Sequence, residues 1–261
     1  LVNNAGIAAQ PGNGQILAFN RATWDTYSDQ QQDWIVVHEL GHTLGLQHVA
    51  GLPAALDYSQ YTIMSYNWSQ LGDENTGEGL PLTPMALDVA LLQARYGATT
   101  TNLGDTTYAL SNAGIDLNGA DGFEQNGRGY VCIWDSGGTD SITFGGSSGA
   151  LINLNAATLQ TGGFTGDLAD VIGDVAQTSR IFAGLSAVAK AEITDPVATA
   201  GGFFSSILAG SQRGAGGYTI ANDAVVEAGS GGSGADLLIG NAVGDSLAGN
   251  AGGDDLYGGG G

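Results

Sequence analysis

The sequence has 261 residues, among them 45 glycines, and its length suits one or two domains. Six lysines and arginines stand against 26 aspartates and glutamates, which gives a formal net charge of −20. This charge excludes nucleic acids and anionic membrane surfaces as partners, because both would be repelled, whereas excess carboxylate suits Ca²⁺. The single cysteine, Cys132, excludes an intrachain disulfide.

The chain begins at Leu1 without an initiator Met and stops inside a repeat, "GGDDLYGGGG". We therefore expect a fragment of a longer protein, truncated at both ends. No apolar run is long enough to span a bilayer.

The first predicted element is a strand within residues 14–24, "GQILAFNRATW". A helix follows, with Ser28 or Asp29 as its cap and Gly45 at its end. Its apolar residues recur at helical spacing, namely Trp34, Val37, Leu40 or Gly41, and Leu44.

Residues 49–82 read as a loop with one apolar island, "YTIMSYNW". Thr83 and Pro84 suit a helix start, with Thr as the cap and Pro at the first position. The pattern "MALDVALLQARY" continues this helix to Gly97.

After residue 98, short β-prone pieces such as "YVCIW", "SITF" and "ALINLN" alternate with turn residues. An insertion at about 166–216 interrupts them, and we expect helices at Ser179–Ile193 and Gly202–Leu208. From Gly231 a nine-residue period begins, with "GGSGADLLI", "GNAVGDSLA" and "GNAGGDDLY".

All three histidines of the chain, His38, His42 and His48, lie within eleven positions of "VVHELGHTLGLQHVAG". The first two lie one helical turn apart on the same face, and the break at Gly45 lets His48 supply a third nitrogen. Three imidazoles at about 2.0–2.1 Å leave an open position on Zn²⁺ for water. Glu39 lies beside this position and is the candidate general base.

A helix with two core histidines and a third by chance is the alternative. The extended pattern HExxHxxGxxH, with no other histidine in the chain, makes coincidence a poor account.

At these residues the sequence resembles a known family. "HELGHTLGLQH" is similar to the zinc signature of the metzincin endopeptidases, and "TIMSY" resembles their Met-turn. The resemblance implies that Met64 underlies the zinc site, and that Tyr66 is an extra zinc ligand that helps to stabilise the oxyanion. "PMALDVALLQARYGA" and "GDTTY" resemble serralysins in particular, although these usually have Pro where this chain has Val49.

The nonapeptide pattern GGxGxDxUx uses Gly for tight turns, Asp as a calcium ligand and one large apolar residue that points inward. Because a full coil takes two nonapeptides, Asp236 and Asp254 should stack 18 residues apart, with Asp245 on the opposite side. A flexible Gly/Ser/Asp linker is the alternative, and the regular placement of Asp and Leu argues against it. The predicted calcium residues of the repeats are Gly232, Gly234, Asp236, Gly240, Asp245, Gly249, Gly253 and Asp254.

The loop "WDSGGTDS" at 134–141 resembles the calcium loop that precedes the roll in serralysins. The resemblance implies further calcium ligands at Asn102, Gly104, Thr106, Asp135, Gly137, Gly138, Asp140 and Glu227.

Taken together, we expect an α+β protein: the C-terminal part of a metzincin catalytic domain at 1–97, followed by an all-β parallel β-roll at 98–261. The resemblance implies a secreted zinc endopeptidase that acts on proteins or peptides, with one Zn²⁺ and several Ca²⁺, and we expect a monomer. Two alternatives stay open, which are a calcium-dependent binding or adhesion module with a vestigial protease part, and a zinc hydrolase with a non-protein substrate.

Overall fold

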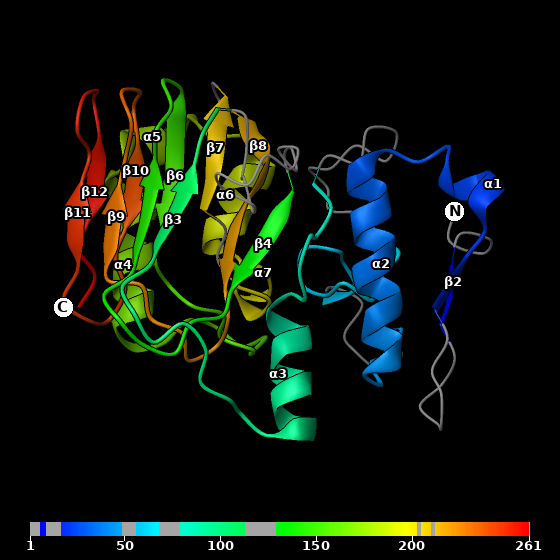
Figure 1. Cartoon of the computed structure of the whole chain (residues 1–261). Coiled ribbons are helices and arrows are strands. Elements are labelled where there is room, and N and C mark those ends of the chain that lie inside the picture. The colour runs from blue at the N-terminus through cyan, green and yellow to red at the C-terminus, as the bar shows by residue number, and fades with distance from the viewer. Residues whose placement is uncertain are drawn as a thin grey trace.

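The computed structural model describes residues 6–8, 17–48, 56–67, 79–112, 129–202, 205–209 and 212–260. Val49 and the end of the island "YTIMSYNW", from Trp68, lie outside these residues. Two stacked β-sheets occupy one end of the molecule, and helices α2 and α3 lie beside them (Figure 1).

The N-terminal part holds β1 (Gly6–Ala8), β2 (Leu17–Phe19), α1 (Arg21–Trp24) and α2 (Asp29–Thr43). The strand predicted over residues 14–24 is therefore too long. It ends at Phe19 because the side chain of Asn20 accepts a hydrogen bond from the N–H of Ala22 and starts α1. Helix α2 begins after Ser28, as predicted, with a full capping box to Gln31.

Helix α3 (Ala86–Tyr96) ends at Gly97 as predicted but begins two residues later than expected, after Met85. Thr83 does not cap it, because its hydroxyl accepts the N–H of Cys132 in a neighbouring strand. The carboxylate of Asp88 instead accepts the N–H of Met85 at the start of the helix.

The remaining strands form a six-stranded sheet, in the order β12-β10-β6-β7-β8-β4, and a four-stranded sheet, in the order β11-β9-β5-β3. Three strands fall where the β-prone pieces predicted them, at β4 (Tyr130–Ile133), β5 (Ser141–Phe144) and β6 (Gly149–Asn153). The remaining elements of these sheets are β3 (Thr107–Leu110), β7 (Ser205–Ala209), β8 (Gln212–Ile220), β9 (Ala228–Ser230), β10 (Leu237–Ile239), β11 (Ser246–Ala248) and β12 (Asp255–Tyr257).

The repeats stack in parallel with the predicted 18-residue offset, because Leu238 of β10 pairs with Leu256 of β12. β11 joins the opposite sheet beside β9, which places successive nonapeptides on alternate sides. Leu238 is fully buried between the sheets and Leu247 packs against the same core. Leu256 differs from the expected inward position, since it is 44% exposed on the edge strand β12.

The insertion holds α4 (Gly166–Thr178), α5 (Arg180–Gly184), α6 (Ala187–Thr194) and α7 (Pro196–Ala200). Helix α4 was missed in the sequence, and the helix expected at Ser179–Ile193 is divided into α5 and α6. The helix expected at Gly202–Leu208 is wrong, since β7 lies there and pairs antiparallel with both β6 and β8. The β7–β8 hairpin thus widens the large sheet.

The helices of the insertion cover the outer face of the large sheet. Neighbouring residues of one strand serve different cores, because successive side chains point to opposite faces. Ile152 of β6 packs between the sheets, while Leu151 packs with Val171 and Phe182 beneath the helices. β10 is likewise buried on both faces, which explains its continuous apolar run "LLI".

The core between the sheets also contains Leu56, Tyr61 and Met85, so it includes residues from both sides of position 98. The domain boundary there stays a prediction. The chain is a mixed α and β protein with parallel strands, and within the described ranges no helix is long and apolar enough to cross a membrane.

Candidate metal centre

Helix α2 positions the first two histidines, and its end positions the third. Its buried face runs through Trp34, Ile35, His38, Glu39 and Gly41. The helix stops where Gly45 takes a φ of +88°, a left-handed conformation that suits glycine. The chain then turns back, with the N–H of Leu46 bonded to the carbonyl of Gly41, and brings His48 to the helix.

The three imidazoles converge through their Nε2 atoms. Nε2 of His48 lies 3.2 Å from that of His38 and 3.0 Å from that of His42. On two of the rings a backbone carbonyl holds the opposite nitrogen: Nδ1 of His38 donates to Ile63 at 2.7 Å, and Nδ1 of His42 donates to Leu46 at 3.0 Å. These bonds place the protons on Nδ1 and turn the Nε2 lone pairs toward the same point.

This set of donors fits a metal ion. Lone pairs that converge at such distances repel one another unless a cation lies between them. Tetrahedral zinc with bonds of about 2.0–2.1 Å requires nitrogens about 3.3 Å apart, close to the observed separations. Among the described residues this is the one group of three histidine, cysteine or acidic side chains with metal-binding spacing. His38, His42 and His48 are therefore brought together as predicted.

The pKa shifts of two rings favour the neutral form, which is the form that binds metal. Burial lowers the pKa of His38 to about 4, although the hydrogen bond to Ile63 opposes the shift. Burial also lowers the pKa of His48, and the neighbouring His42 contributes. Neutral imidazoles at neutral pH retain the lone pairs that bind metal.

Tyr66 and Met64 both lie close to the histidine group. The hydroxyl of Tyr66 lies 2.6 Å from Nε2 of His48, so its oxygen borders the same point. Met64 is 1% exposed, and its sulfur packs against Gly41. Gly41 lies between the first two histidines in the sequence. Glu39 is buried on α2, and its charge adds to the burial that raises the pKa of Tyr66.

The residues predicted for the first calcium cluster also meet. Asp140 links the segments, because its Oδ1 accepts the N–H of Thr106 and its own N–H donates to Oε2 of Glu227. Gly138, at φ +133°, lies against the carbonyl of Gly104. Asn102 bonds to Tyr108, whose hydroxyl donates to Asp135, and Asp135 in turn accepts the N–H of Gly137. Burial raises the pKa of Asp140, and neighbouring carboxylates add to this.

The repeat aspartates lie inside the turns rather than in solvent. Asp236 is fully buried, and it accepts the N–H groups of Ala150 and Gly232. Its own N–H donates to Oδ1 of Asp254, which confirms the predicted stacking 18 residues apart.

The glycines that flank these aspartates differ in their surroundings. Gly249 lies against Asp254 and Gly240 against Asp245, while Gly234 packs on the backbone of Ser148. A Cβ at Gly253 would meet open space, so nothing near it requires glycine. Asp245 lies on the opposite side, and its buried Oδ1 has no hydrogen-bond partner among the described residues. The chemistry of such a buried carboxylate oxygen suits a ligand to a cation.

Comparison with known proteins gives the family resemblance. No family model matches the chain. It is 33% identical over 151 residues to a serralysin of Photorhabdus laumondii, which covers 50% of this chain and 31% of that protein. A serralysin of Proteus mirabilis is 37% identical over 137 residues, covering 46% and 27%, and the metallopeptidase AprA of Pseudomonas marginalis is 37% identical over 158 residues, covering 51% and 32%. The chain is serralysin-like. It spans about a third of the length of these curated relatives.

The sequence analysis missed one buried residue that supports the metal centre. Asp88 of α3 is fully buried and accepts hydrogen bonds from the Thr62 hydroxyl, the N–H of Ile63 and the N–H of Met85. The carbonyl of Ile63 in turn holds His38. The sequence feature that points to Asp88 is its position as the one acidic residue in the otherwise apolar pattern "MALDVALL".

Proposed function

We propose that the protein containing this chain is a secreted zinc-dependent endopeptidase whose substrates are proteins or peptides. The convergence of three Nε2 atoms, with Tyr66 and Glu39 beside them, is the observation that carries this proposal. His38, His42 and His48 would hold the zinc, with Tyr66 as a further ligand. The similarity to serralysins supports the choice of a peptidase over other zinc hydrolases.

Bound zinc would supply Lewis-acid chemistry, polarising a substrate carbonyl and making water acidic. Glu39 would accept the proton of the attacking water, since it follows His38 on α2, is buried, and its charge acts on Tyr66 at the site. The hydroxyl of Tyr66, which lies 2.6 Å from Nε2 of His48, would donate to the oxyanion that develops on the carbonyl. The carbonyls of Ile63 and Leu46 keep the imidazoles oriented through each turnover.

We further propose that calcium stabilises the strand-rich half as a β-roll of the kind found in calcium-binding repeats. The parallel 18-residue coils, the buried Asp236 and the unpartnered Oδ1 of Asp245 support this assignment. Calcium would be held by the two residue sets described above, namely the segments around Asp135–Asp140 and the turns of the repeats. Mutual repulsion of carboxylates such as Asp236 and Asp254 would then be neutralised.

Hydrolysis of a broad protein substrate such as casein by the full-length protein tests the activity, with and without a zinc chelator. Glu39→Gln should retain zinc but lose turnover by several orders of magnitude, since it lacks the proton acceptor. Asp29→Asn, an exposed change of the same charge on the same helix, is the control.

Wild-type turnover by Glu39→Gln would refute the role of Glu39. A wild-type protein that binds zinc and calcium but cleaves no protein would instead favour the adhesion module or a hydrolase with another substrate.

A further inference from the structure

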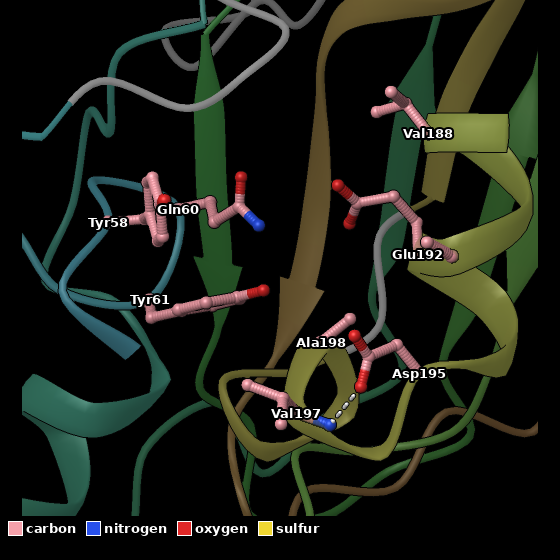
Figure 2. Close-up of a pocket in the computed structure, with 9 residues that line it drawn as sticks. Tyr58, Gln60, Tyr61, Val188, Glu192, Asp195, Val197 and Ala198 are labelled. Atoms are coloured by element: carbon pink, nitrogen blue, oxygen red, sulfur yellow. Dashed lines mark hydrogen bonds between the residues drawn. The ribbon is translucent and has the colours of Figure 1, made fainter. Parts of the chain in front are cut away.

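A cavity of about 250 Å³ lies away from the three histidines, where the insertion meets the segment that precedes the Met-turn (Figure 2). Tyr58, Gln60 and Tyr61 form one wall. Residues of α6 and α7 form the other, with Glu192 and Asp195 as its polar members. The carboxylate of Glu192, the amide of Gln60 and the hydroxyl of Tyr61 point into the gap between the walls (Figure 2).

Both walls are rigidly built. The N–H of Tyr61 donates to the carbonyl of Tyr58 at 3.0 Å, and the Tyr61 ring packs so closely on Gly201 that a Cβ there would collide with it. On the other wall, Oδ1 of Asp195 accepts the N–H of Val197 at 2.9 Å and thereby caps α7. The cavity is therefore shaped before any ligand arrives, which reduces the cost of binding.

The lining is acidic, aromatic and partly apolar. Glu192 is only 9% exposed, so its carboxylate lies in an environment where electrostatic attraction is stronger than in water. The described residues that line the cavity include no lysine or arginine. Tyrosine rings attract cations through their faces, and the net charge of −20 raises the local concentration of cations.

We propose that this cavity binds an organic cation, specifically an alkyl ammonium or alkyl guanidinium group. The charged end pairs with Glu192 and Asp195, and the alkyl stem lies against Val188, Val197 and Ala198. The volume is below the roughly 300 Å³ at which drug-sized ligand sites begin, so a short chain is favoured. This site does not depend on the zinc centre.

Butylguanidinium is the first probe, and butylurea, its uncharged counterpart of the same shape, is the ligand control. Binding to the whole chain is followed by ligand-observed NMR and calorimetry. Butylguanidinium should bind and butylurea should not, and Glu192→Gln should weaken binding by roughly tenfold or more because a charge-assisted hydrogen bond is lost. Asp174→Asn, an exposed change of the same charge on α4, should alter binding less than about twofold because salt screens it.

Equal binding of the two probes, no binding of butylguanidinium, or equal weakening by Glu192→Gln and Asp174→Asn would each overturn the proposal. If Glu192→Gln does not fold, Asp195→Asn replaces it, since Asn retains the cap of α7 while it removes the charge. Competition by the tripeptide acetyl-Gly-Arg-Gly-amide separates the two sources of such a cation. Displacement of butylguanidinium assigns the site to basic side chains of polypeptides, and failure to displace it assigns the site to free small cations.

Discussion

The buried hydrogen bonds of Asp88 allow a quantitative prediction of how much this residue stabilises the fold next to the metal centre. Asp88→Ala leaves the Thr62 hydroxyl and the N–H groups of Ile63 and Met85 without their acceptor in a fully buried place. At about 2 kcal/mol for each buried donor, the loss is about 6 kcal/mol.

The buried charge opposes this loss. Burial raises the pKa of Asp88 from 3.8 to about 6, so its ionised form costs the folded state about 3 kcal/mol at pH 7. Asp88→Ala has no carboxylate to ionise, so the variant does not carry this cost in its folded state. The net destabilisation expected for Asp88→Ala at pH 7 is therefore about 3 kcal/mol.

The pH dependence provides a second measurement. Because the folded pKa of Asp88 lies above the unfolded value, the native state binds more protons between pH 3.8 and about 6, and wild-type stability falls as the pH rises through this window. Asp88→Ala lacks this contribution. The difference in the free energy of unfolding between wild type and variant should therefore increase by about 1 kcal/mol from pH 7 to pH 5.

Urea unfolding followed by tryptophan fluorescence measures both quantities. Asp167→Ala is the matched control, since it removes an exposed acid from the first turn of α4 and should cost less than about 1 kcal/mol. A loss of less than about 1 kcal/mol for Asp88→Ala at pH 7, or a difference that decreases toward pH 5, would refute the reasoning.

Three further predictions concern the zinc centre and the repeats. Tyr66→Phe should lower kcat more than it raises KM in the full-length protein, because the proposed donor to the oxyanion is lost; an effect confined to KM would place Tyr66 in substrate binding instead. Gly41→Ala places a Cβ 2.8 Å from the Met64 sulfur, so overpacking of about 1–3 kcal/mol should cancel or exceed the helix gain of about 1 kcal/mol. In the control Gly173→Ala, which meets only Gln177 at 3.8 Å, that gain should appear in full as a higher urea midpoint, and equal stabilisation of both variants would contradict the packing argument. Asp236→Ala should raise the calcium concentration needed for β-structure in circular dichroism, whereas Asp174→Asn should not; a spectrum that is the same in chelator and in calcium would show that the repeats fold by other means.

The sequence alone was sufficient for features whose partners lie close along the chain. The Ser28 capping box, the helix end at Gly45 and the approach of His48 to His38 and His42 depend on contacts between residues no more than 10 positions apart. The 18-residue register of the repeats follows in the same way, because each coil repeats the turn chemistry of the preceding one.

Only the tertiary structure decided the features that depend on distant partners. The Thr83 hydroxyl accepts the N–H of Cys132 rather than capping α3, and the Asp88 carboxylate accepts the N–H of Ile63, 25 residues earlier in the chain. Tertiary packing brings each of these N–H groups to its acceptor. The segment expected as a helix at Gly202–Leu208 became β7, since the free edges of β6 and β8 offer backbone partners that outweigh its local propensity. The cavity beside Glu192 is lined by segments more than 120 residues apart, and no local sequence pattern predicts that they are neighbours.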